Sequence, residues 1–554
     1  MLLIIGLDGA TWDLIDPWIR AGRLPHLERL RRHGLSGPLA STVPPATFPS
    51  WSTFMTGVNP GKHGIFDFTR RQLGTYSVQF VNASFRKVPT VWKQLSAAGR
   101  RVCVLGVPGT YPPEDLNGYM ISGFDTPVTT RADASFVSPR TLAPLVEQSG
   151  GFPFADFQEF RVGRRWYAMA LERLLRGIET KTRLAQTLLR QEEWDCFLLL
   201  FGESDTVAHH FWKFHDGNSP LFDADGAQEF GTAICRVYEA LDAAIGALIR
   251  AAAPAAVLVA SDHGFGGTGT KAVYLNQWLA RAGFQRRQHQ RAAAPAVTRL
   301  KRAALQYLPP QLQTRLFRAQ AGRWASWLET RARFAGIDWN DTRAFSEELN
   351  YFPSVWLNVK GREPAGIVAP TDYERVRRDL CLAAEALRDP EHGGALVRRA
   401  WRREELYEGP WTEYAPDIVL EFEYDRGYSY RCLPTASAAP PAAVRIVPAH
   451  ERAGGKLAGM SGSHRPDGIF VLSPVRTNAA RACPAAIADL APTILQLCGV
   501  DPPPGLDGRA LHELEPSRLQ PLTADTGPSP AEHLYGPAEE HEIAARLTAL
   551  GYLQ

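Results

Sequence analysis

The chain has 554 residues, of which 45% are hydrophobic and 21% charged, and its formal net charge is +3. That length suffices for a large α/β core with insertions, and the composition is ordinary for a globular protein. The near-neutral charge gives no general bias toward nucleic acid or membranes, so specific nucleic-acid binding is not expected. The seven cysteines are scattered and form no C-x-x-C pair, which argues against a disulfide framework or thiolate metal site and favours a reducing compartment.

The N-terminal segment MLLIIGLDGA is apolar but lacks a basic region before it, and Asp8 interrupts it after a few residues. It therefore predicts a first buried strand rather than a signal peptide. No stretch approaches the roughly 20 apolar residues of a membrane span. A cytoplasmic protein is expected.

Short apolar runs predict buried strands along the chain. They are LLIIGLDG (2–9), RVCVLGVP (101–108), CFLLLFGESD (196–205), AAVLVASDHG (255–264) and GIFVLSP (468–474). Helical patterns lie between them, for example at 24–34 and 91–99. This alternation predicts an α/β fold with a mostly parallel central sheet and helices on both faces. Ligands collect at the carboxyl ends of such strands, where three of the runs carry Asp8, Asp205 and Asp262.

Residues 281–337 are expected to form an insert that contains twelve Lys and Arg but one acid, Glu329. Leucines at roughly helical spacing, with Pro309 and Pro310 as a break, predict a basic helical hairpin. Three interpretations remain open for it: a solvated helix pair on the core, a lid over an anionic substrate, and weak contact with an anionic membrane surface.

The last part of the chain predicts a linker followed by a helix. Residues 513–535 are rich in Pro, Ser and Thr, and 538–553 have an acidic start and an apolar stripe. The predicted organisation is thus a catalytic domain over 1–512, with the 281–337 insert, and a linker and C-terminal helix over 513–554.

Three carboxylates and three imidazoles lie next to the predicted strand ends. They are Asp8, Asp205, His209, Asp262, His263 and His464. Mixed nitrogen and oxygen ligands suit zinc and related divalent ions better than calcium or magnesium alone. Asp205 and His209 are four residues apart, so their side chains converge if a helix begins there. Each residue alone has a structural alternative, such as an N-cap or a packed histidine, and the indication comes from the ordered set.

Thr47 lies in STVPPATFPSWSTFMTG (41–57), two residues before Pro49 and at the start of an apolar helical run. It could simply be a helix N-cap. Alternatively, its hydroxyl lies at the positive end of a helix dipole, where an approaching phosphate is favoured and a metal could activate it as a nucleophile. The local sequence supports both interpretations equally.

The ordered motifs resemble the alkaline phosphatase superfamily, and most closely its type I phosphodiesterase/nucleotide pyrophosphatase branch. They are GLDG (6–9), TFPSWSTFMTGVNPGKHGIFDF (47–68), ESDTVAHH (203–210), SDHGFGG (261–267), GSHRPDGIF (462–470) and ADLAPTILQLCGVDPPPGLDGRAL (488–511). The resemblance spans roughly residues 1–511 apart from the insert, and as an ordered set these motifs are highly specific.

The resemblance implies an alkaline-phosphatase-like fold and two metal sites. One site would use Asp205, His209 and His464, and the other Asp8, Asp262 and His263. Thr47 would be both nucleophile and metal ligand, forming a phospho-threonine intermediate. Zinc is the usual metal in this branch, with manganese as the alternative.

One position departs from the branch. An Asn commonly follows the HGI motif there and contacts a phosphate oxygen, but Phe68 stands near that place in HGIFDF (63–68). Arg70, Lys271 and Arg465 are the candidate replacements, because cations pair with phosphate oxygens. An ordinary surface role is the alternative for each.

The expected function is metal-dependent hydrolysis of a phosphodiester or phosphoanhydride bond in a small molecule, such as a nucleotide or a lipid headgroup. A phosphomonoesterase or phosphotransferase on the same site is one alternative. A non-catalytic binding protein that retains the fold is another. A sulfatase is disfavoured because TFPSW lacks the C/S-x-P-x-R context, and a mutase because those relatives place Ser at the nucleophile position.

Overall fold

The computed structural model describes residues 1–127, 134–155, 163–287, 330, 333–334, 336–435, 442–449, 452, 460–473, 481–511, 533–549 and 553. Most of the predicted 281–337 insert and of the predicted 513–535 linker lies outside the described residues. No helix within the described ranges is long and apolar enough to cross a membrane.

A ten-stranded, mostly parallel sheet forms the centre of the molecule, as predicted. Along the sheet the strand order is β20-β2-β19-β9-β1-β8-β5-β6-β7, with β21 beside β2. The apolar runs at 2–9, 101–108, 196–205, 255–264 and 468–474 become β1 (Leu2–Leu7), β5 (Val102–Leu105), β8 (Cys196–Phe201), β9 (Ala256–Ala260) and β19 (Asp467–Ser473). β1 pairs in parallel with both β8 and β9, so their carboxyl ends meet at one edge. β19 runs antiparallel to its neighbours β9 and β2.

The remaining strands of this sheet lie at its two ends. They are β2 (Leu35–Ala40), β20 (Arg481–Ala482) and β21 (Ala485–Ala486) at one end, and β6 (Gly118–Ile121) and β7 (Val137–Ser138) at the other.

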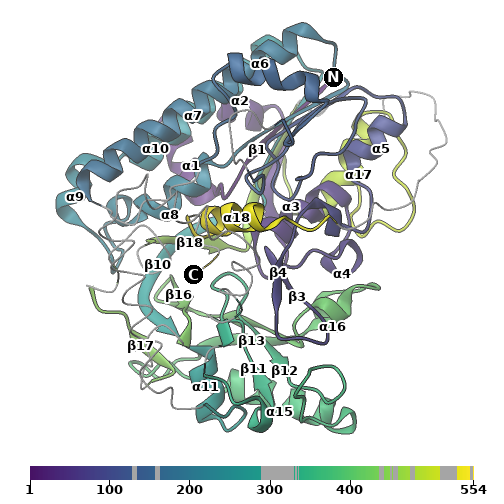
Figure 1. Ribbon diagram of the computed structural model, residues 1–554. Coiled ribbons are helices and arrows are strands. Elements are labelled where there is room, and N and C mark those ends of the chain that lie inside the picture. The colour runs from purple at the N-terminus through teal and green to yellow at the C-terminus, as the bar shows by residue number, and fades with distance from the viewer. Residues whose placement is uncertain are drawn as a thin grey trace.

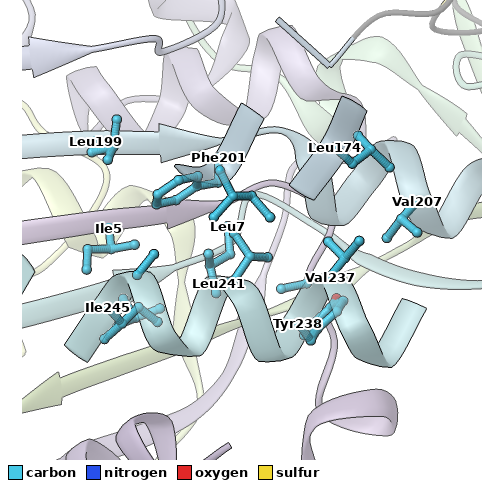
Figure 2. Packing of buried hydrophobic residues seen from close by; sticks show 14 of the residues in the cluster. Ile5, Leu7, Leu174, Leu199, Phe201, Val207, Val237, Tyr238, Leu241 and Ile245 are labelled. Atoms are coloured by element: carbon cyan, nitrogen blue, oxygen red, sulfur yellow. The ribbon is translucent and has the colours of Figure 1, made fainter. Parts of the chain in front are cut away.

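Helices cover both faces of this sheet (Figure 1). One face packs on α1 (Trp12–Arg20), α2 (Pro25–Arg32), α7 (Arg164–Gln191), α8 (Glu203–His215) and α10 (Ala233–Ala252). The other packs on α3 (Thr47–Thr56), α5 (Val91–Ala97) and α17 (Leu490–Leu497). Figure 2 shows Ile5 and Leu7 of β1 against Leu241 and Ile245 of α10. Leu2 and Ile4 point to the opposite face, because side chains alternate along a strand.

Smaller sheets lie beyond the carboxyl edge of the central sheet (Figure 1). A five-stranded sheet contains β10 (Gly264–Val273), β15 (Tyr424–Asp425), β16 (Tyr428–Cys432), β17 (Val444–Ile446) and β18 (Gly462–Arg465). A four-stranded sheet contains β11 (Ala344–Phe345), β12 (Ser354–Leu357), β13 (Val397–Arg402) and β14 (Ile418–Phe422), and it packs on α15 (Tyr373–Glu385). β3 (Thr69–Arg71) and β4 (Val78–Phe80) form a hairpin.

The predicted C-terminal helix is present as α18 (Pro537–Ala549), drawn in yellow in Figure 1. Its Ile543 and Leu547 are buried in a cluster with Phe48 of α3 and with Phe68. Arg546 donates hydrogen bonds to the backbone carbonyls of Phe124 and Thr126. The end of the chain therefore packs beside the first turn of α3, at the edge where the predicted ligands gather.

The other described helices are α4 (Pro60–His63), α6 (Ala143–Gln148), α9 (Ala224–Phe230), α11 (Leu275–Arg281) and α16 (Arg403–Leu406).

Candidate active site

The sheet brings the three predicted aspartates together. Asp8 directly follows β1, Asp262 comes two residues after β9, and Asp205 is the third residue of α8, which begins just after β8. These three strands are adjacent and parallel, so the residues that follow them meet at one edge. α8 begins at Glu203, which places Asp205 and His209 one turn apart on the same face, as their spacing predicted.

The six predicted ligands form one buried cluster. His209 Nε2 lies 3.3 Å from Asp205 Oδ1 and 3.2 Å from His464 Nε2. His263 Nε2 lies 3.3 Å from Asp262 Oδ2 and 3.6 Å from Asp8 Oδ1. His263 also joins the two predicted groups, because its ring stacks on His464 with centroids 3.6 Å apart. Ligand atoms of Asp205, His263 and His464 lie within 4.8 Å of one another, as do those of Asp8, Asp262 and His263.

The backbone fixes which nitrogen of each imidazole faces the cluster. The Nδ1 atoms of His209, His263 and His464 lie 3.1, 3.0 and 2.9 Å from the carbonyl oxygens of Gly462, Gly264 and Pro45. A carbonyl can only accept, so each Nδ1 carries the proton. In a neutral ring, Nε2 then keeps its lone pair, which is the arrangement that metal-ligating histidines use.

Burial perturbs the ionisation of these groups. It lowers the pKa of His263 well below the usual value and also lowers that of His464, which keeps both rings neutral. Burial raises the pKa of Asp262 to about 8. For Asp8, burial and the negative charges of Asp262 and Asp205 together raise the pKa. Burial also acts to raise the pKa of Asp205, but His209 and His464 lower it overall. The carboxylates of the cluster therefore lie close enough to repel one another, and a bound cation would relieve this repulsion.

The donor set fits divalent metal ions. Asp8 Oδ1, Asp205 Oδ1 and Asp262 Oδ2 are buried oxygens that accept no hydrogen bond. A buried, unsatisfied carboxylate oxygen is costly, and a cation removes that cost. Neutral imidazole nitrogens and carboxylate oxygens together are a zinc-type set.

Thr47 lies at the N-terminus of α3 with its side chain against this cluster. Ala46 is the N-cap, so Thr47 is the first helical residue rather than the cap. Its side chain is fully buried, and Oγ1 lies 3.3 Å from His263 Nε2. The hydroxyl is thus beside the Asp8, Asp262 and His263 group and at the positive end of a ten-residue helix.

The three candidate phosphate-binding cations do not gather around Thr47 in the contacts that the structure describes. Lys271 is buried and pairs with Asp389 at 2.9 Å, Glu391 at 2.6 Å and Asp425 at 3.1 Å. Arg465 donates to the carbonyl of Gly427 and the hydroxyl of Ser429, next to the β15–β16 turn. Arg70 lies over the rings of Phe85 and Tyr414. Their role in substrate binding stays a prediction.

Phe68 is a packing residue in this structure. Its buried ring lies against Phe48 of α3, with centroids 4.2 Å apart, and Phe124 completes the contact. Aromatic side chains therefore occupy the place near the N-terminus of α3 where the family pattern suggests an amide.

Several residues that support the site were missed from the sequence. The Trp51 indole donates to Asp8 Oδ2 at 3.3 Å, and the Ser204 hydroxyl to the Asp8 carbonyl at 2.6 Å. Trp51 could have been found, because it is four residues after Thr47 and shares its helix face. Tyr351, whose ring stacks on His464, lies far from every motif, so no sequence feature marks it as a residue of the site.

A buried ion pair anchors the start of α8. Lys181 Nζ of α7 lies 2.9 Å from Glu203 Oε1, and both side chains are at most 3% exposed. Lys181→Met is expected to destabilise the protein by about 3–5 kcal/mol, because it leaves a buried carboxylate without its partner. Equilibrium unfolding in urea measures this.

Arg183→Met on the same helix is the matched control, because its pair with Glu179 is more than half exposed and has the same 2.9 Å separation. Its expected effect is below about 1 kcal/mol. Equal effects of the two substitutions would contradict the anchoring role of Lys181.

The chain is similar to known proteins in sequence and in fold. Residues 2–432 match the family model described as type I phosphodiesterase / nucleotide pyrophosphatase. A search of curated proteins found no match.

Solved structures with similar folds include phosphonoacetate hydrolase from Sinorhizobium meliloti 1021. Its complex with phosphonoacetate has a TM-score of 0.52 at 14% identity, and that with phosphonoformate 0.50 at 15%. Human ectonucleotide pyrophosphatase / phosphodiesterase 5 gives a TM-score of 0.43 at 14% identity. Each match covers 90% of this chain and at least 94% of the other. The phosphonoacetate hydrolase matches show the alkaline-phosphatase-like fold.

Proposed function

Because the chain belongs to the type I phosphodiesterase / nucleotide pyrophosphatase family and is thus a phosphoric ester hydrolase, we propose that it cleaves phosphodiester or phosphoanhydride bonds in a metal-dependent reaction with Thr47 as nucleophile. The observation that carries the proposal is the position of the Thr47 hydroxyl, which is buried and 3.3 Å from His263 Nε2 at the N-terminus of α3.

We propose that one divalent ion is held by Asp205, His209 and His464, and the other by Asp8, Asp262 and His263 with Thr47. When bound, such ions lower the pKa of a hydroxyl and stabilise charge on the attacking and leaving oxygens. Zinc fits the mixed set of imidazoles and carboxylates, and manganese is the alternative.

The proposed reaction has two steps. The Thr47 oxygen bonds to phosphorus and loses its proton as the bond to the leaving oxygen breaks, and the leaving group takes up a proton. Water then attacks phosphorus, the bond to Thr47 breaks and the threonine is protonated again. The positive end of the α3 dipole favours the phosphate charge throughout.

The proposed substrate is a small phosphate ester with an organic group, such as a nucleotide or a lipid headgroup. Phe48, Phe68 and Phe124 support this proposal, because they give the surroundings of the nucleophile helix an apolar, aromatic character. A cytoplasmic location is part of the proposal, and the scattered cysteines, which form no C-x-x-C pair, support it.

The test is turnover of bis(p-nitrophenyl) phosphate and p-nitrophenyl phosphate by the full chain, with and without added Zn²⁺ or Mn²⁺. Metal-dependent cleavage that favours the diester is expected. Faster cleavage of the monoester would support the phosphomonoesterase or phosphotransferase alternative. Absence of bound metal together with inactivity after metal addition would support a non-catalytic binding protein.

A further inference from the structure

Tyr351 reaches the metal-ligand cluster from a different sheet than the ligands. It lies between β11 and β12 of the four-stranded sheet. Its phenol oxygen is 3.4 Å from His209 Nδ1, and its ring lies parallel to that of His464, with centroids 4.1 Å apart and planes inclined by 15°. One side chain therefore contacts two of the three residues proposed to hold one metal ion.

His464 is enclosed between two rings. The His263 imidazole stacks on it at 3.6 Å and 20°, and Tyr351 at 4.1 Å and 15°. A flat ring stacked on two neighbours cannot rotate about its side-chain bonds without losing both contacts. The hydrogen bond from His464 Nδ1 to the Pro45 carbonyl fixes the remaining direction, so Nε2 stays directed at Asp205, 3.5 Å away.

His209 is oriented by two acceptors. Its Nδ1 lies 3.1 Å from the Gly462 carbonyl and 3.4 Å from the Tyr351 hydroxyl oxygen. The carbonyl can only accept, so the proton lies on Nδ1 and the lone pair on Nε2, which faces Asp205 at 3.3 Å, and the Tyr351 oxygen then serves as a second acceptor. Groups that orient ligating histidines in this way strengthen metal binding.

The segment that carries Tyr351 contains a strained backbone residue, Glu348. Glu348 is not a glycine but adopts a left-handed φ of 55°, which costs about 1–3 kcal/mol. Its buried carboxylate accepts hydrogen bonds from the amides of Asn276 and Thr435 and from the Thr435 hydroxyl, at 2.6 to 2.8 Å. The Asn350 side chain accepts another from the Cys432 amide at 3.0 Å. These bonds offset the strain and fasten the segment to the neighbouring elements.

We propose that Tyr351 is a positioning residue that orients His209 and His464 and thereby sets the divalent-metal affinity of the Asp205, His209 and His464 group. This inference rests on the proposed function. Metal binding at one of the two sites then depends on the docking of the four-stranded sheet against the central sheet.

The test is calorimetric titration of Zn²⁺ into the chelator-stripped full chain, with bound metal counted by elemental analysis. Wild type is expected to bind two equivalents. In Tyr351→Leu one equivalent should bind about 10–100-fold more weakly, which is the usual effect of losing a group that orients a ligand, and the other should be unchanged. Tyr351→Phe keeps the stacked ring, so the zinc affinity of that equivalent is expected to fall by less than about ten-fold.

Two further variants separate this role from a folding defect. Glu348→Gln keeps Tyr351 but weakens the hydrogen bonds that hold its segment. It should lower the zinc affinity of the same site that Tyr351→Leu affects. Tyr119→Leu, on the central sheet at β6, should leave both affinities unchanged. Wild-type affinities in folded Tyr351→Leu would overturn this inference alone, whereas a wild-type chain that binds no divalent metal would overturn the proposed function as well.

Discussion

Replacement of Thr47 by alanine is expected to lower phosphodiester turnover by at least about 10³-fold, because the substitution removes the proposed attacking oxygen. The folded structure should tolerate it. Thr47 is buried, but the substitution removes only a hydroxyl and a methyl group, and Ala46 remains the N-cap of α3. Steady-state kinetics on bis(p-nitrophenyl) phosphate with saturating metal measures the loss.

Bound metal distinguishes a lost nucleophile from a damaged site. Thr47→Ala should keep both zinc equivalents, because the six proposed aspartate and histidine ligands are unchanged. Thr47→Ser retains a hydroxyl at the same atom and should retain much of the turnover. Near-normal turnover in the alanine variant would rule out Thr47 as the nucleophile.

Replacement of Asp262 by asparagine is expected to remove one zinc equivalent and to lower turnover by more than about 10²-fold. Asp262 is fully buried, and its Oδ2 lies 3.3 Å from His263 Nε2 without accepting a hydrogen bond. An amide oxygen carries no net charge, so it binds a divalent cation more weakly. Residues that do not bind the metal but orient its ligands contribute about 10–100-fold to metal affinity or activity. A residue that binds the metal directly should contribute more.

Asp425→Asn is the matched control for this substitution. Asp425 belongs to a third cluster with Asp389 and His392, where the Lys271 ammonium already lies among the carboxylates. It should therefore leave zinc stoichiometry and turnover near wild type. Two retained equivalents in Asp262→Asn, or one lost in Asp425→Asn, would contradict the assignment of the metal groups.

Much of the central sheet could be predicted because its residues follow local rules. LLIIGL and AVLVA are continuous apolar runs, as strands buried on both faces must be, and each is followed by an aspartate. The D-x-x-x-H spacing also predicted the convergence of Asp205 and His209, since a helix places them one turn apart. The grouping of His464 with the other proposed ligands depended on the family order of motifs, because nothing in the local sequence shows that β18 pairs with β10 beside His263.

Contacts between distant parts of the chain could not be predicted. Tyr351 meets His464 only because the four-stranded sheet docks at the carboxyl edge of the central one, and no periodicity records that docking. The charges of Arg70, Lys271 and Arg465 make them candidates for phosphate binding, but charge alone does not reveal which groups they contact. Lys271 is surrounded by three acids that follow it by more than 110 residues. The antiparallel direction of β19 could not be predicted either, because an apolar run has the same sequence pattern in parallel and antiparallel strands.

The covalent step through Thr47 is tested most directly by acid quenching of the zinc-loaded protein during turnover of bis(p-nitrophenyl) phosphate, followed by peptide mass spectrometry. The proposed mechanism predicts a p-nitrophenyl phosphoryl group on the peptide that contains Thr47, absent from Thr47→Ala and lost when the quench follows substrate exhaustion. Rapid turnover with no adduct on that peptide at any quench time, or an adduct on another residue, would contradict it.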